Sequence, residues 1–111
     1  DLSQLAVNKG ALMMTFKVDK HPVGTVTQRM DCGWPCSGSI AMADFFSSIP
    51  EGQWSTVGIS LECFSKVGVD LKKVTSPLVL VSKEPFIITF NDVRVVPNAP
   101  EKSLINCDSS S

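Results

Sequence analysis

Several residue types and patterns that common functions require are scarce or missing in this sequence. It contains no tyrosine and one histidine, His21, so a nucleophilic serine or cysteine has one candidate base and a zinc site has one candidate imidazole. No apolar run approaches the roughly 18 residues of a membrane span, and no glycine-rich phosphate-binding loop is present. The formal charge of -1 offers no attraction to a nucleic-acid backbone or an anionic bilayer. These absences argue against nucleic-acid binding, nucleotide binding and membrane spanning.

The residues that are present indicate one small β-rich domain. The chain has 111 residues, which suits a single domain, and its hydrophobic share of 43% is ordinary for a globular protein. Valine, isoleucine and threonine supply 25 of the 111 residues, and such β-branched side chains favour strands over helices. Composition therefore predicts an all-β fold and, by itself, no function.

Alternation of apolar and polar residues predicts short strands separated by turn signals. Every second side chain from Leu12 to Val18 is apolar, and Val57, Ile59 and Leu61 alternate in the same way. The predicted strands are Ala11–Val18, Thr25–Met30, Gly38–Met42, Trp54–Leu61, Pro77–Val81, Phe86–Phe90 and Val93–Val96. The run in residues 77–81 is continuously apolar, so that strand is expected to be covered on both faces. About eight short strands with little helix are typical of a β-sandwich, and we expect a jelly roll.

Two short helical segments and a tail complete the predicted organisation. Residues 43–49 and 63–68 are expected to form helical turns, and the six phenylalanines are assigned to the core or to the ends of the sheets. Pro97 and Pro100 end strand pairing. We therefore expect the sandwich to occupy residues 1–97 and residues 98–111 to form a polar, flexible tail.

Four cysteines in a short chain indicate disulfides and an oxidising compartment, extracellular or periplasmic. Cys32 and Cys36 flank a glycine and a proline, whose turn geometry brings the two Cα atoms close enough for a bridge that fixes the loop. A redox-active dithiol would space its cysteines by two residues, and a zinc knuckle would need paired short spacings that are absent here. Whether Cys63 pairs with Cys107 or is a free thiol stays open. The first residues carry neither a signal peptide nor an initiator Met, so export is expected to be specified outside this segment.

Six short motifs follow one another along most of the chain. They are Met30–Gly38 around the first two cysteines, Pro50–Trp54, Ile59–Phe64, Gly68–Leu71, Ser76–Leu80 and Asn91–Arg94. In this order they resemble the C-terminal domain of bacterial family 3 glycoside hydrolases of the ExoP type, which are exo-acting β-glucosidases or glucanases. The resemblance implies a galactose-binding-like β-sandwich, appended to a catalytic barrel and similar in shape to many carbohydrate-binding modules. The catalytic residues of that family lie in other domains, so the resemblance assigns no catalytic residue here.

Carbohydrate binding requires an aromatic plane for the apolar face of a sugar ring and polar partners for its hydroxyls. Trp34, between the first two cysteines, is the first candidate platform, and packing over a sandwich edge is its alternative role. Trp54 is the second candidate, with an architectural role at a strand start as the alternative. Arg29 is the candidate polar partner, and its alternative role is an ion pair with Asp31. The predicted carbohydrate-binding residues are therefore Trp34, Arg29, Trp54 and Asp31.

The chain by itself is expected to be non-catalytic and to need no cofactor. Glycoside hydrolysis uses two carboxylates that flank a sugar-sized cleft, whereas the aspartates of this chain lie in or beside turn signals. His21 precedes a proline in a predicted turn and is expected to be solvated rather than to act as a base. Structural calcium is common in related sandwiches, but no acidic cluster has the spacing of a calcium loop. No metal site is therefore expected.

The sequence leads to two functional hypotheses. The first is a non-catalytic accessory module that binds β-glucan of the cellulose, mixed-linkage or laminarin type within an exo-β-glucosidase or glucanase. Its partners would be that polysaccharide and the catalytic domains of the parent enzyme. The alternative is an interaction domain that binds no sugar and packs on those catalytic domains through the outward-facing Met13, Trp34 and Trp54.

Overall fold

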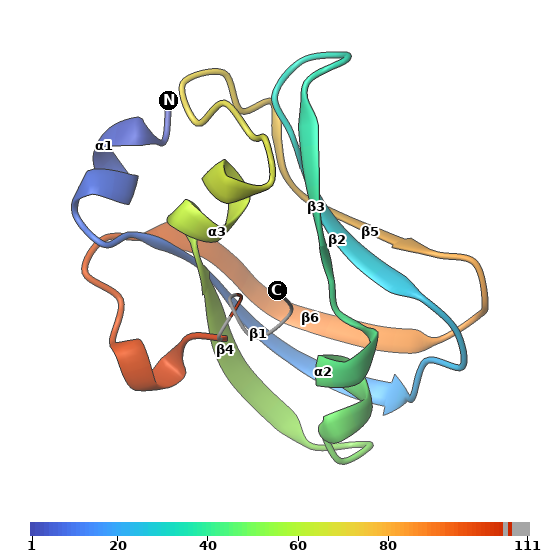
Figure 1. The fold of residues 1–111 in the computed structure, drawn as a ribbon. Helices are drawn as coiled ribbons and strands as arrows, with labels where there is room; N and C mark the ends of the chain where they lie inside the picture. Colours follow the sequence, from blue (N-terminus) through green and yellow to red (C-terminus); the bar gives the residue numbers. More distant parts are fainter. Residues whose placement is uncertain (106, 108–111) are drawn as a thin grey trace.

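The computed structural model describes residues 1–105 and 107, and these form a sandwich of two antiparallel sheets, each with three strands (Figure 1). The first sheet has the strand order β4-β1-β6 and the second sheet the order β3-β2-β5. The elements in chain order are α1 (Ser3–Val7), β1 (Ala11–Lys20), β2 (Val26–Asp31), β3 (Ser37–Ala41), α2 (Ala43–Ser48), β4 (Trp54–Ser60), α3 (Leu61–Lys66), β5 (Ser76–Ser82), β6 (Ile87–Val96) and η1 (Glu101–Ser103). The expected all-β sandwich is confirmed, with six strands in the described residues rather than about eight.

β1 is the central strand of the first sheet and supplies the middle of the core. Its buried side chains are the predicted ones, Leu12, Met14, Phe16 and Val18. The residues between them are only half-buried and lie on the outer face. On β4, Ile59 is buried and Val57 packs against the core, as the alternation predicted. Leu61 was expected to end this strand; it begins α3 instead and is nevertheless fully buried.

β2 is the central strand of the second sheet and alternates in the same way. Val26, Gln28 and Met30 are buried in the core, whereas residues 27, 29 and 31 are half-exposed on the outer face. Successive side chains of a strand point to opposite faces. Burial of the first set therefore places Arg29 and Asp31 together on the outer face.

A cluster of phenylalanine rings fills the end of the sandwich at α2. Phe46 of α2 is buried against Phe16 of β1, with ring centroids 5.5 Å apart and an interplanar angle of 88°, a favourable edge-to-face arrangement. Phe45, Phe86 and Phe90 make further ring contacts with this pair. The assignment of these rings to the core and the sheet ends is confirmed.

A disulfide joins α3 to the end of the described chain. Cys63 of α3 bonds to Cys107, with the two Cα atoms 6.0 Å apart. Just before Cys107, Leu104 forms a parallel bridge with Gly58 of β4, and the Ile105 N–H donates to the Gly58 carbonyl at 2.8 Å. The pairing that the sequence left open is therefore a disulfide, and it fixes the chain end along the edge of the first sheet.

The boundary proposed at residue 97 stays a prediction. Within residues 98–105, Ala99 is buried and Leu104 and Ile105 are half-buried, which is more burial than we expected for a polar tail. Residues 106 and 108–111, on which the flexible-tail prediction also falls, lie outside the described residues.

The prediction of two separate strands near the end of the chain is wrong. Phe86–Phe90 and Val93–Val96 belong to one continuous strand, β6, which begins at Ile87. Its pairing register with β1 shifts by one residue, so that Asn91 is absorbed as a β-bulge. Asparagine and aspartate are common turn residues, but here the strand includes both of them because β6 stays paired with β1.

The prediction that residues 77–81 are covered on both faces is also wrong. This strand, β5, lies at the edge of the second sheet. Leu78 and Leu80 pack against the core, whereas Val79 is half-buried and Val81 is 42% exposed. A continuous apolar run gives no periodicity from which an exposed face can be read. The outer face of the second sheet is consequently open to solvent.

Gln28 should weaken the core in which it lies. Its Nε2 donates to the Met14 Sδ at 3.5 Å, but its Oε1 has no hydrogen-bond partner among the described residues. An unpaired buried carbonyl costs about 1–3 kcal/mol, so Gln28→Met should raise the free energy of unfolding by about that amount. Urea titration followed by circular dichroism measures the change. Gln28→Ala is the control, because it also removes the carbonyl but leaves a cavity and should destabilise the fold. A loss of stability in Gln28→Met would contradict the prediction.

The two disulfides should contribute unequally to stability. The sequence separation is 44 for Cys63–Cys107 and 4 for Cys32–Cys36. Loop-closure entropy in the unfolded chain corresponds to about 4 kcal/mol for the longer loop and about 2 kcal/mol for the shorter. We therefore expect Cys63→Ala/Cys107→Ala to lower the free energy of unfolding more than Cys32→Ala/Cys36→Ala in parallel urea titrations. The reverse order would contradict this entropic account.

Candidate functional site

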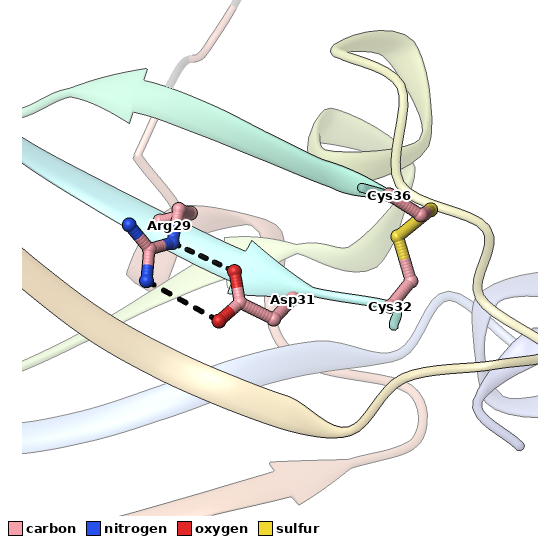
Figure 2. A network of polar contacts seen from close by, with 4 residues as sticks. All are labelled: Arg29, Asp31, Cys32 and Cys36. Atoms are coloured by element: carbon pink, nitrogen blue, oxygen red, sulfur yellow. Dashed lines mark hydrogen bonds and ion pairs between the residues drawn. A yellow bond between two sulfur atoms is a disulfide. The ribbon is translucent and has the colours of Figure 1, made fainter. Parts of the chain in front are cut away.

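β2 and β3 are connected by residues 32–36, which we call the cysteine loop. Cys32 and Cys36 form a disulfide with their Cα atoms 5.0 Å apart. The Cys32 N–H donates to the Cys36 carbonyl at 3.0 Å, and the Cys36 N–H donates to the Gly33 carbonyl at 2.6 Å. Gly33 has a φ of +88°, a conformation that residues with a Cβ atom rarely adopt. The covalent bridge and the two hydrogen bonds together fix the shape of the loop, just beyond the end of β2 (Figure 2).

Trp34 projects from the cysteine loop into solvent. Its side chain is 98% exposed, and the peptide bond to Pro35 is cis. The alternative role considered for Trp34, packing over an edge of the sandwich, is therefore wrong. The exposed indole presents a large apolar plane that a ligand can cover.

Arg29 and Asp31 form a two-point ion pair on the outer face of β2. Arg29 Nε donates to Asp31 Oδ1 at 2.7 Å, and Nη2 donates to Oδ2 at 3.3 Å. Figure 2 shows the two side chains lying side by side, next to the disulfide. A guanidinium has five N–H donors, of which this pair uses two. The ion pair expected as an alternative role therefore exists, and it orients a guanidinium that has donors left for a ligand.

A shallow hollow of about 190 Å³ connects these groups. Its lining residues are Arg29, Asp31, Trp34, Cys36, Ser37 and Thr75. The structure thus brings three of the four predicted site residues together, and we call this hollow the Trp34 site. Ser37 and Thr75 were not predicted. Thr75 is 44 positions away from Asp31 in the sequence, but its N–H donates to the Asp31 carbonyl at 2.8 Å, a contact with no local sequence signal.

The outer face of the second sheet next to the Trp34 site carries mostly short side chains. Ser39 of β3 and Val79 of β5 lie opposite Arg29 on either side. One row further along β2, Ala41 and Val81 flank Thr27. Small residues beside an exposed sheet face leave room for an extended molecule to lie along it.

Trp54 does not lie at the Trp34 site. It begins β4 in the first sheet, where it pairs directly with Lys17 of β1. The Lys17 Nζ is 5.2 Å from the centre of the indole, within the range of a cation–π interaction, and the Trp54 side chain is 50% exposed. Trp54 therefore lies in the first sheet and Trp34 on a loop of the second, and the structure separates the fourth predicted residue from the other three.

The docking patch expected under the alternative hypothesis is not continuous. Met13 and Trp54 lie on the first sheet, whereas Trp34 lies on the loop at the end of the second sheet. Met13 is half-buried and lies over Gly58, where Leu104 also approaches. Because the end of the chain approaches this position, the three residues do not form one exposed apolar surface.

His21 lies in the turn after β1 with its side chain 39% exposed, as expected, and it also makes structural contacts. Its Nε2 lies 2.5 Å from the carbonyl oxygen of Ile49, and its backbone N–H donates to Glu51 Oε2 at 2.8 Å. The ring therefore connects the turn after β1 to the segment that leads into β4. Among residues 1–105 and 107, no group of three His, Cys, Asp or Glu side chains is placed to bind a metal ion.

Two further observations concern the cellular location of the chain. None of the helices in the described part of the chain has the length and apolar character needed to cross a membrane. The two disulfides fit a domain outside the cytoplasm.

Comparison with known proteins gives a family match over most of the chain. A family model described as galactose-binding domain-like, for the C-terminal domain of ExoP-type proteins, matches residues 1–95. No curated protein and no solved structure matches the chain. The family match confirms the resemblance carried by the six sequence motifs and the galactose-binding-like sandwich that it implied. Domains of this kind are typically non-catalytic, and they suggest carbohydrate binding or an accessory role.

Removing the Cys32–Cys36 disulfide should loosen the cysteine loop and leave the sheets intact. The disulfide closes the ends of a loop whose internal backbone hydrogen bonds connect Cys32, Gly33 and Cys36, and the Asp70 N–H donates to Cys32 Sγ at 3.5 Å. In Cys32→Ser/Cys36→Ser, the amide of Cys36 should therefore lose its protection from hydrogen exchange. The amide of Gln28, in the centre of β2, should keep its protection. Unchanged protection at residue 36, measured by NMR, would show that the backbone bonds alone fix the loop.

Proposed function

This chain belongs to the galactose-binding domain-like family, and we propose that it is a non-catalytic module that binds β-linked glucan at the Trp34 site. The observation that carries the proposal is the fully exposed indole of Trp34 beside the fixed Arg29–Asp31 pair, over one hollow. We further propose that it serves an exo-β-glucosidase or glucanase outside the cytoplasm, in an extracellular or periplasmic location. Binding needs no cofactor or metal ion in this proposal.

The chemistry of the Trp34 site matches the two sides of a sugar ring. The C–H groups of one ring face stack on the indole of Trp34, which excludes water from both surfaces. The ring hydroxyls then reach the Arg29 guanidinium, the Asp31 carboxylate and the hydroxyls of Ser37 and Thr75, which line the hollow. The site thus offers both hydrogen-bond donors and acceptors, and a sugar hydroxyl can use both.

The shape of the surface favours a linear glucan over a single sugar. The hollow lies beside the open outer face of β2, where Ser39 and Val79 flank Arg29. A β-linked glucose chain is extended, so it can lie along such a face with one ring on Trp34. An open site buries little of each ring, and weak binding follows.

Weak binding is sufficient for an accessory module. Attachment to a catalytic domain makes the second binding event intramolecular, so the enzyme stays at a high effective concentration near its polymer. The gain comes from proximity, and the chemistry of the catalytic domain is unchanged.

Replacing Trp34 should remove binding and preserve the fold. A central aromatic residue at a binding surface is commonly worth about 2 kcal/mol, so Trp34→Ala should weaken the affinity for β-glucan about thirtyfold. Arg29→Met, which keeps a long side chain but removes the guanidinium, should weaken it to a smaller extent. Affinity electrophoresis of the isolated chain, with and without soluble mixed-linkage β-glucan in the gel, measures the retardation of each variant.

Val23→Ala is the matched control for this experiment. Val23 is 79% exposed and lies in the turn before β2, at the end of that strand opposite to the cysteine loop. The Val23→Ala variant should bind β-glucan as the unchanged chain does. Equal retardation of Trp34→Ala and Val23→Ala would overturn the Trp34 site. No retardation of the unchanged chain would favour the alternative, in which exposed Trp34 contacts the parent enzyme's catalytic domains.

A further inference from the structure

We propose that the outer face of the first sheet carries a second glycan-binding site, centred on Trp54, and that the domain is therefore bivalent. We call this surface the Trp54 face. It depends on the proposed function only for the choice of ligand, because its residues are separate from those of the Trp34 site. The experiment below tests the two sites individually.

Trp54 is exposed and oriented at the edge of the sheet. Half of its side-chain surface is open to solvent, and the Lys17 ammonium lies 5.2 Å from the ring centre. Lys17 is itself placed by an ion pair with Asp19, at 3.6 Å between Nζ and Oδ1. Lys17 thus lies over one face of the indole and supports its position, the exposed half of the side chain is left for a ligand, and Lys17 can also donate hydrogen bonds to sugar hydroxyls.

The row of outward residues next to Trp54 is polar on all three strands of the sheet. The next outward row contains Thr56 of β4, Thr15 of β1 and Asp92 of β6. The hydroxyls of Thr15 and Thr56 are 3.0 Å apart, and Arg94 Nε donates to Asp92 Oδ2 at 2.7 Å. The face therefore offers hydroxyl, carboxylate and guanidinium groups in fixed positions, which are the partners that sugar hydroxyls need.

The Trp54 face has the same types of residue as the Trp34 site. Each has an exposed tryptophan and an arginine–aspartate pair two residues apart on the outer side of one strand, Arg29–Asp31 on β2 and Asp92–Arg94 on β6. In both pairs the Nε–Oδ distance is 2.7 Å. The hydrogen bond to Asp92 and the charge of its carboxylate raise the pKa of Arg94 above its ordinary value.

The spacing on the Trp54 face suits an oligosaccharide. With strands about 4.8 Å apart and a rise of about 3.4 Å per residue, the Cα atoms of Trp54 and Asp92 are on the order of 12 Å apart. A single ring stacked on Trp54 does not reach that far, but neighbouring rings of a chain do. The Met13 side chain over Gly58 and the nearby Leu104 bound the face at its far end.

The two sites point away from each other. The sheets pack through their inner faces, so Arg29 of the second sheet and Asp92 of the first lie on opposite outer surfaces of the sandwich. One glucan chain lying flat on one face does not meet the other. A bivalent domain would consequently link two chains, or link a chain to a second polysaccharide surface.

NMR titration of the full chain with cellohexaose and laminarihexaose separates the two sites. The chain has only two tryptophans, so its two indole N–H signals report one site each. We expect both signals to shift on titration. Trp54→Ala should remove the shifts at Thr15, Thr56 and Asp92 while the affinity measured at Trp34 changes by no more than about twofold, since distant sites act independently. Trp34→Ala should leave the Trp54 titration intact.

Val7→Ala is the matched control for Trp54→Ala, because Val7 is 77% exposed and lies in α1, before the start of β1. Shifts confined to the Trp34 signal would overturn the second site and leave the proposed function standing. Shifts confined to the Trp54 signal would support the second site and overturn the Trp34 site. No shift of either signal would overturn both.

Cross-linking of a polymer tests bivalency directly. The unchanged chain mixed with soluble mixed-linkage β-glucan should increase light scattering, because each domain joins two chains. Trp34→Ala and Trp54→Ala should each abolish the increase while still binding the hexasaccharides at one site. An increase that persists in Trp54→Ala would overturn the second site.

Discussion

The alternation of β1 and β2 is the constraint on which the rest of the structure depends. These central strands face each other across the core, so the inward side chains of each are apolar, as Met14 and Met30 are, with Gln28 as the one polar exception on β2. The residues between these apolar positions do not pack in the core, and their side chains point outward. Arg29 and Asp31 are neighbours on the surface for this reason alone. A slip of one residue in the register of β2 would exchange the two sets and destroy the core and the Trp34 site together.

The two disulfides fix parts of the chain whose positions the alternation of the strands does not determine. A strand pairing fixes residues within a sheet, but it leaves loops and chain ends undetermined. Cys32–Cys36 fixes the loop that presents Trp34, and Cys63–Cys107 holds the chain end against the edge of β4, where Leu104 and Gly58 form a bridge. Each disulfide also removes conformational entropy from the unfolded chain, and so adds stability to that of the core. Covalent closure therefore allows a large part of the surface to be polar and exposed without loss of the fold.

The parts of the site that follow from local pattern could be predicted from the sequence. The ion pair considered for Arg29 and Asp31, two residues apart, is present, and the cysteine spacing together with flanking glycine and proline predicted the loop that exposes Trp34. The parts that depend on strand order could not. Trp54 was grouped with Trp34 because both are aromatic, but only the pairing of β4 with β1 assigns Trp54 to the other sheet. Thr75 enters the site through a backbone contact between distant segments, for which residue types give no signal.

A sandwich of two small sheets has a geometry that favours binding on its surface over binding in a cleft. Each sheet uses one face for the core, which leaves its outer face open to solvent. An open face buries little of a ligand and binds it weakly. A polymer compensates for this weakness, because it offers many equivalent segments and a second contact becomes intramolecular once the first has formed. The exposed tryptophans and arginine–aspartate pairs on opposite faces are thus better suited to a long polysaccharide than to a single sugar, since only a polymer allows two weak contacts to act together.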